Sequence, residues 1–329
     1  MALNPVTFHI VGQLLNTSVM VARPGGGFTF KGGHYKRTLT WNGHTYDIQI
    51  KEFTGAELLS ILGDRQAVAA VPSRMGMRWE CLLVMSSTQP PTGPACTSPP
   101  RDMQFLEAAY RTALMVWCHN VPWWNDTVHI HQPYPRHGGG ITRSTALSKW
   151  NWTWMRPAQI NPTDYATFHA LVDFYKDTPQ DQFGNVLSLA TNCFDQAGRV
   201  LDDKLSFLML MVGMEALMKP SDDKFKLAGK RISWVLADTK AQRNTLVKAF
   251  NEDPDCYRDL RNRVAHGDPA LDGIIISTNQ FTQDVSAQVR RAAVRLILEY
   301  QANPPGQGQD YYNWLKGYVD RRIQALPPR

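Results

Sequence analysis

The sequence has few cysteines, and their spacing excludes the usual cysteine frameworks. It contains five, with no Cys-x-x-Cys pair among them: Cys81, Cys96, Cys118, Cys193 and Cys256. Small secreted domains and zinc ribbons carry cysteines in even numbers or in close pairs. We therefore expect a protein of the reducing cytoplasm that has no disulfide framework.

Long apolar runs are lacking as well. The N-terminus shows no basic stretch followed by an uninterrupted apolar segment, so we expect no signal peptide. The most apolar stretch, residues 205–218, is too short to span a membrane and contains Glu215. We expect this stretch to form a buried core helix, and we expect no contact with a membrane.

The sequence also lacks a complete motif for a nucleotide or a metal ion. The glycine triplets at residues 25–27 and 138–140 are not followed by Lys-Ser or Lys-Thr, so we interpret both as loops. His129 and His131 would share one face of a strand and could bind a metal with Cys118, His119 or His137, but this spacing is not diagnostic. We expect neither a cofactor nor a metal ion.

The composition is that of a globular protein. The chain has 329 residues, of which 43% are hydrophobic and 19% are charged, and its formal net charge is +6. This length is sufficient for two domains. A basic balance suits a polyanionic partner without proving one. Basic residues are dispersed, and only the last part of the chain concentrates them: Arg290, Arg291, Arg295, Lys316, Arg321 and Arg322.

The first half of the chain has the alternating pattern of β-strands. Asn42 and Gly43 separate two such segments and predict a type I′ hairpin turn. Trp150, Trp152 and Trp154 would share one strand face, either as a stacking platform for bases or, the better interpretation, as part of a core. We expect strands at 6–15, 26–31, 35–41, 44–50, 67–71, 79–85, 128–131 and 150–154, and helices at 55–62 and 102–118.

From Pro162 onward every apolar segment has helical periodicity. The expected helices cover residues 164–176, 185–196, 202–218, 222–236, 240–250, 254–266, 280–301 and 310–325. The fold class is therefore α+β. We expect a β-rich sensor or regulatory domain at residues 1–155 and an all-α helical bundle at residues 156–329.

A charged helical segment near the end of the chain carries the clearest chemical signal. It contains Arg261, Asn262 and His266 and is followed by Gly267 and Pro269, which end helices. Arginine holds a phosphate through two parallel hydrogen bonds, and histidine transfers protons near neutral pH. These residue types are sufficient to cut RNA without a metal ion.

The spacing of these residues leaves their arrangement open. Arg261 and His266 would lie roughly 140° apart around a helix, whereas Asn262 and His266 would share a face. Either one long arginine bridges the offset, or a symmetric homodimer brings two arginines and two histidines to one cleft. The spacing alone is weak, because Arg37 and His44 show a comparable one across a predicted hairpin.

The segment resembles the HEPN domain family, specifically its Apea-like branch, in which Asn, Asp or His often follows the motif arginine. Arg261-Asn262 with His266 carries the resemblance, supported by the apolar segment 205–217 that ends in Met-Glu-Ala-Leu and by the helical segment 289–298. The resemblance covers the chain from Pro157 onward. It implies a helical, metal-independent endoribonuclease, a toxin or antiviral-defence effector that acts on RNA. Some HEPN domains are instead catalytically silent scaffolds, so dimerisation or RNA binding is the alternative function.

Each site residue has an expected role. His266 would move a proton, Arg261 would stabilise charge on phosphate oxygens, and Asn262 would orient one of them. Glu215 needs a partner if it is buried, either Arg261 or Lys219. His266 has an alternative role as a helix-ending residue that caps carbonyl groups. The N-terminal domain would meet a protein or phage-derived trigger.

Overall fold

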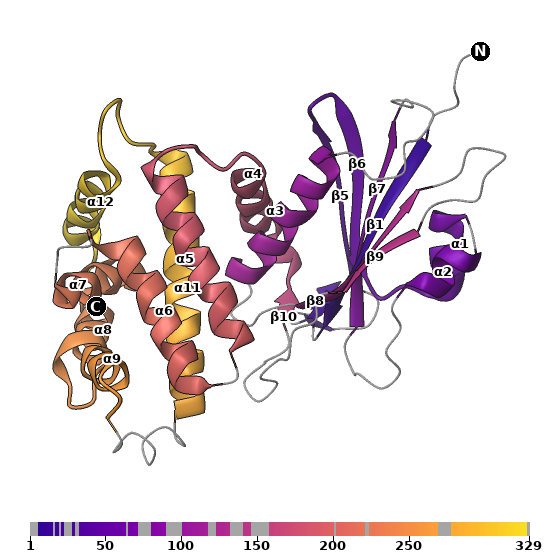
Figure 1. Ribbon diagram of the computed structural model, residues 1–329. Coiled ribbons are helices and arrows are strands. Elements are labelled where there is room, and N and C mark those ends of the chain that lie inside the picture. Colours follow the sequence, from indigo (N-terminus) through magenta and orange to yellow (C-terminus); the bar gives the residue numbers. More distant parts are fainter. Residues whose placement is uncertain are drawn as a thin grey trace. The chain divides into compact units, whose positions relative to one another are not determined.

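The structure is a computed structural model (Figure 1), and the chain folds into two compact units. The first consists mainly of Met1–Leu114, Asn120–Ser148 and Arg156–Val172, and the second mainly of Asp173–Arg329. The residues described are 6–15, 17–19, 21–22, 28–29, 33–63, 65–71, 80–89, 101–117, 123–131, 141–145, 158–200, 202–220, 224–268 and 278–327.

An antiparallel sheet dominates the described part of the first unit. Its strand order is β5-β6-β7-β1-β8-β9, so the N-terminal strand β1 lies inside the sheet between β7 and β8. Two short pairs accompany it: β3 with β4, and β2 with β10. The strands are β1 Val6–Leu15, β2 Thr17–Val19, β3 Val21–Ala22, β4 Phe28–Thr29, β5 His34–Trp41, β6 His44–Lys51, β7 Glu80–Gln89, β8 Trp123–His131, β9 Ile141–Thr145 and β10 Ala158–Ile160.

The hairpin between β5 and β6 has the predicted turn. Asn42 and Gly43 both have positive φ angles, 50° and 79°, as a type I′ turn requires. Trp41 pairs with His44 directly across the turn, which fixes the register of the whole hairpin. This local prediction from the sequence is confirmed.

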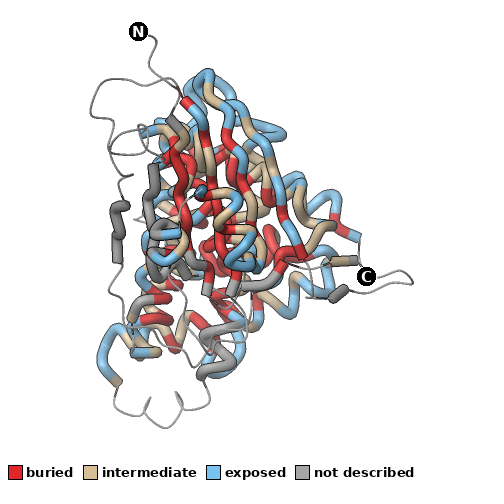
Figure 2. Tube along the Cα trace, turned by 90° about the vertical axis from the view of Figure 1, so that its right-hand side faces the viewer, coloured by how far each residue is buried: buried red, intermediate tan, exposed pale blue. Residues whose placement is uncertain are grey.

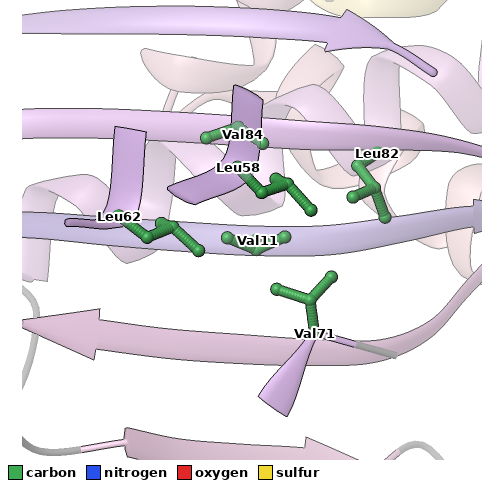
Figure 3. Packing of buried hydrophobic residues seen from close by; sticks show 6 residues of the cluster. All are labelled: Val11, Leu58, Leu62, Val71, Leu82 and Val84. Carbon is green, nitrogen blue, oxygen red and sulfur yellow. The ribbon is translucent and has the colours of Figure 1, made fainter. Parts of the chain in front are cut away.

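Helices α1, Gly55–Leu62, and α2, Arg65–Ala70, pack on one face of the sheet. Figure 3 shows the contact, in which the side chains of Leu58 and Leu62 on α1 and Val71 meet Val11 of β1. The predicted strand at 67–71 is wrong, because this segment is helical up to Ala70. A short run of alanine and valine fits either structure, and the high helix propensity of alanine favours the helix here.

The opposite face of the sheet is covered by α3, Arg101–Trp117, and by the first half of α4, Tyr165–Lys176. Tyr35 of β5 is fully buried there, hydrogen-bonded through its hydroxyl to that of Tyr110 at 3.2 Å and edge-on to the ring of Phe168. Because Phe168 and strand β10 pack within the first unit, residues 156–172 belong to it. The predicted boundary at 155/156 thus lies earlier in the chain than the boundary between the compact units.

The described part of the second unit is helical, which confirms the α+β fold class. Several helices begin at an aspartate whose side chain accepts a backbone N–H of the first turn: Asp181, Asp202 and Asp310. The helices are α5 Gln182–Arg199, α6 Asp203–Met218, α7 Phe225–Leu236, α8 Lys240–Val247, α9 Tyr257–Ala265, α11 Thr278–Ala302 and α12 Tyr311–Ala325, and a π-helical turn, Lys248–Glu252, follows α8.

Helix α6 contributes many buried residues to the core of this unit. In the first unit, Figure 2 shows buried residues alternating with more exposed ones along strands such as β6. Gly213 of α6 faces the ring of Phe194 on α5, and the hydroxyl of Ser206 donates to the carbonyl of Ala197 at 2.7 Å. Arg290 of α11 is fully buried and donates to the carbonyl oxygens of Met115 and Phe194. This arginine is therefore not part of a surface for a polyanion.

Some sequence predictions lie outside the described residues. They include the predicted strand at 150–154 with its tryptophans, both glycine triplets and the side chains of His129, His131 and Cys118. Among the helices that the structure does describe, none is long and apolar enough to cross a membrane.

Candidate functional site

Arg261 and Asn262 lie on α9, and His266 directly follows this helix. A residue with a left-handed backbone conformation lies close to each end of α9. Asp255, with a φ of 56°, turns the chain just before the helix, and Gly267, with a φ of 66°, follows its end. The amide of Gly267 donates to the carbonyl of Val264 at 3.1 Å, and that of Asp268 donates to the carbonyl of Arg263 at 3.0 Å. This pair of bonds is a Schellman motif, which needs a residue without a Cβ penalty at position 267. Gly267 thus ends the helix as predicted.

His266 is the C-cap residue and lies one position beyond the last helical residue, Ala265. Its backbone amide donates to the carbonyl of Asn262 at 3.0 Å, and its side chain is exposed. The imidazole makes no hydrogen bond or ion pair with the part of the chain that the structure describes. Capping of carbonyl groups at this end is performed by backbone amides, and the ring is directed to solvent.

Arg261 is held by a carboxylate from another helix. Its Nε donates to Oε1 of Glu215 on α6 at 3.1 Å, and its Nη1 donates to Oδ1 of the neighbouring Asn262 at 3.3 Å. Lys219 approaches the other oxygen of the same carboxylate, with 3.5 Å between its Nζ and Oε2. Both partners that the sequence offered for Glu215 are therefore present at once.

Glu215, Lys219 and Arg261 form a charged cluster that is largely buried, so the stability of each charge depends on its partners. The side chain of Glu215 is 16% exposed and that of Lys219 is 7% exposed, whereas 31% of the Arg261 side chain remains accessible. A carboxylate so far removed from water is costly without cationic partners. With two cations and one anion, the cluster carries a net charge of +1, and its accessible member is the guanidinium. Such a site attracts an anion such as phosphate.

The end of α6 that carries Glu215 is fixed by contacts that the sequence did not indicate. The hydroxyl of Tyr312 donates to the carbonyl of Ala216 at 2.9 Å, and that of Tyr311 donates to the carbonyl of Leu217 at 2.7 Å. Nη1 of Arg231 donates to the carbonyl of Met218 at 2.8 Å. These bonds satisfy carbonyl groups that the end of the helix leaves without internal partners.

The other arginines of α9 are neutralised by carboxylates close to them in sequence. Arg258 pairs with Asp259 at 3.0 Å, and Arg263 pairs with both Asp255 and Asp268 at 2.8 Å. Hydrogen bonds to these carboxylates raise the pKa of Arg258 and of Arg263. Arg261 differs because the carboxylate that it contacts is shared with a lysine.

The structure thus links Glu215, Arg261 and Asn262 through side-chain contacts, and links His266 to Asn262 through the backbone. It shows no side-chain contact between Arg261 and His266 within the described residues. No three His, Cys, Asp or Glu side chains in that part of the chain cluster as metal ligands do. Comparison with family models, curated proteins and solved structures gave no match for this chain.

Proposed function

We propose that the protein is a metal-independent endoribonuclease that cuts RNA at Arg261, Asn262 and His266, with Glu215 in a supporting role. The observation that carries this proposal is the Arg261–Glu215 pair. It holds a partly exposed guanidinium beside Asn262, one turn before an exposed histidine at the end of the same helix. The mechanism needs one side chain that binds the phosphate and one that transfers a proton. Arg261 on α9 and His266 at the end of this helix are of these two types.

In the proposed reaction the ribose 2′-oxygen attacks the adjacent phosphorus, and the bond from phosphorus to the 5′-oxygen breaks. The proton of the 2′-hydroxyl passes to a base, the 5′-oxygen takes up a proton, and the products are a 2′,3′-cyclic phosphate and a 5′-hydroxyl. His266 performs one of these proton transfers, Arg261 stabilises charge on the phosphate oxygens, and Asn262 orients one of them. A homodimer would supply His266 of a second copy for the other transfer.

The biological role that fits this activity is a toxin or antiviral-defence effector in the cytoplasm. The unit that contains the sheet would then receive the activating signal, through a protein or phage-derived trigger. The exposed hairpin turn at Asn42 and Gly43 lies in that unit. Loops of this kind supply contact residues without contributing to the core.

The direct test is cleavage of end-labelled RNA by the purified protein in excess EDTA. We expect cleavage with 2′,3′-cyclic phosphate ends and no cleavage of the DNA of the same sequence, because DNA lacks the 2′-hydroxyl. An RNA with a single 2′-deoxynucleotide at the cleaved position is the matched control and should be spared at that bond. Cleavage of this control at the parent rate would contradict the mechanism.

One observation favours a second candidate function, that of a catalytically silent dimerisation or RNA-binding scaffold. A catalytic histidine is commonly oriented by a third group, and the ring of His266 has no such partner among the described residues. The two functions differ in one measurement. A scaffold binds RNA and leaves it intact in the assay above, with or without EDTA.

A further inference from the structure

A second group of basic side chains surrounds the C-terminal end of α7. Helices α8, α11 and α12 all pack against α7. At its centre is Asp238, whose Oδ1 accepts from Nη2 of Arg295 at 2.8 Å. Nη2 of Arg322 lies 4.0 Å from the same oxygen, and Nη2 of Arg291 lies 3.6 Å from Oδ2. We call this group the Asp238 cluster: Trp234, Asp238, Arg243, Arg291, Arg295 and Arg322.

Two arginines of the Asp238 cluster have a clear structural role. Nη1 of Arg295 donates to the carbonyls of Val235 and Leu236 at 2.9 and 2.8 Å, and Arg322 donates to the carbonyl of Ala237. These carbonyls end α7 and have no partners inside the helix. The fold therefore explains why Arg295 and Arg322 are present.

Carbonyl groups satisfy hydrogen bonds but do not neutralise charge. Three arginines, Arg291, Arg295 and Arg322, share the one carboxylate of the Asp238 cluster. Arg243 adds a fourth positive charge, so three positive charges remain uncompensated within the cluster. The excess lies at the surface, since the side chains of Arg291 and Asp238 are 49% and 57% exposed. Arg291 donates to no carbonyl of the described chain. A surface of this charge favours an anion.

The fourth arginine adds an aromatic component. The guanidinium of Arg243 lies 4.6 Å from the centre of the Trp234 ring, and this tryptophan is partly exposed. A guanidinium stacked on an indole presents planar surfaces next to positive charge, as surfaces that bind single-stranded nucleic acid do. An acidic protein segment would use the charge alone and would gain nothing from the planar stack.

We propose that the Asp238 cluster binds the phosphate backbone of single-stranded RNA, as a surface separate from the Arg261 motif. The identification of the bound RNA as substrate rests on the proposed function. Binding itself does not, because the cluster is defined by its own charges and by the Trp234–Arg243 stack. Arginine forks match phosphate geometry, which the compact ammonium of lysine cannot do as well.

The test measures binding of a fluorescent single-stranded RNA to the full-length His266→Ala protein by anisotropy, over a series of salt concentrations. Arg291→Gln should raise the Kd by about fivefold. It should also make the negative slope of log K against log salt shallower by about 0.7, which corresponds to the loss of one phosphate contact. Arg321→Gln is the matched control, because Arg321 is also exposed but is paired with Glu299 at 2.7 Å. It removes the same charge and should change the Kd less than twofold.

A variant that is expected to strengthen RNA binding while weakening the fold separates effects on binding from effects on folding. Asp238→Asn removes the carboxylate of the cluster, so it should lower the melting temperature and yet bind the RNA several-fold more tightly. Equal Kd values for Arg291→Gln and Arg321→Gln, or no RNA binding by the parent, would overturn the proposal. RNA binding that is weakened by Arg291→Gln, in a protein that never cuts RNA, would support this surface while removing the proposed nuclease.

Discussion

The Nε atom of Arg261 donates to Oε1 of Glu215 at 3.1 Å, across 46 positions of sequence. This contact joins α9, which carries the motif, to the core helix α6. It fixes the position of a guanidinium that remains partly exposed, so the core helix α6 determines where a phosphate bound by Arg261 would lie. Without Glu215 the arginine would be a flexible surface side chain, and ordering it would cost side-chain entropy on each binding event.

The first prediction concerns Glu215→Gln, which keeps the shape of the side chain and removes its charge. Arg261 and Lys219 then repel each other without a shared anion, and the guanidinium loses its orientation. We expect RNA cleavage to fall by about 10- to 100-fold, because small displacements of a positioning group have effects of this size. Lys219→Met is the control, since it leaves the Arg261–Glu215 pair in place. Single-turnover rates measure both, and equal losses would contradict the role of Glu215.

The second prediction concerns His266→Ala, which removes the proton-transfer group. General acid–base catalysis contributes a factor on the order of 10² to 10⁴, so the cleavage rate should fall by about that much. The fold should be unchanged, because His266 is exposed and its ring forms no hydrogen bond or ion pair with the described residues. Circular dichroism and the melting temperature check the fold. A folded variant that cuts RNA at the parent rate would make the scaffold the leading interpretation.

The third prediction concerns Arg261→Lys, which keeps the charge and removes the planar fork. Lysine cannot hold Glu215 and a phosphate through parallel hydrogen bonds, so the cleavage rate should remain well below that of the parent. Arg258→Lys is the matched control on the same helix, because its partner Asp259 is a neighbour in sequence and is exposed. Rates of RNA cleavage by the two variants give the comparison. Full activity of Arg261→Lys would show that point charge alone is sufficient.

Local signals in the sequence predicted much of the fold. Asn42-Gly43 marked the hairpin, Asp202 and Asp310 marked helix starts, and Gly267 marked the end of α9. Each acts through its own backbone conformation or through a cap within a few residues. The segment 67–71 was one exception, because five apolar residues have no period long enough to separate a strand from a helix. The short strands β9 and β10 were not predicted either.

The candidate site was predictable only in its residue types. The sequence offered Arg261 and Lys219 as alternative partners of Glu215, and the fold shows that one carboxylate takes both. That outcome depends on how α6 packs against α9, which no local pattern encodes. The Asp238 cluster shows the same limit, since Arg243 and Trp234 lie outside the basic stretch noticed in the sequence and join it only through packing.

The fourth prediction tests the close packing of α5 against α6. Gly213→Ala would place a Cβ atom 2.7 Å from the Phe194 ring and 3.1 Å from Cβ of Cys193, so the ring or one of the two helices must shift. Overpacking of this kind costs about 1 to 3 kcal/mol of unfolding free energy. Gly317→Ala on α12 is the control, because its nearest neighbour is the end of a flexible side chain at 3.9 Å. It should stabilise the helix by about 0.5 to 1 kcal/mol, and urea denaturation measures both changes.

The fifth prediction concerns the pH dependence of the unit that contains the sheet. His9 of β1 is 2% exposed, its Nδ1 is hydrogen-bonded to Oγ of Ser86 at 2.8 Å, and burial lowers its pKa from 6.5 to about 4. The unfolded chain therefore binds a proton between these two values that the folded protein does not bind. The contribution of neutral His9 to the free energy of unfolding is therefore present above pH 6.5 and is lost as the pH falls toward 4.

For His9 alone this linkage predicts a loss of about 2 kcal/mol between pH 7 and pH 5. Carboxylates lose their charge in acid as well, so the contribution of His9 has to be isolated with a variant. His9→Gln keeps a hydrogen-bonding group next to Ser86 and has no titration in this range. Urea denaturation at both pH values should show a smaller acid loss for His9→Gln than for the parent, by about that 2 kcal/mol. Equal losses in the two proteins would mean that His9 is protonated in the folded state, and that the site around its ring is open to water.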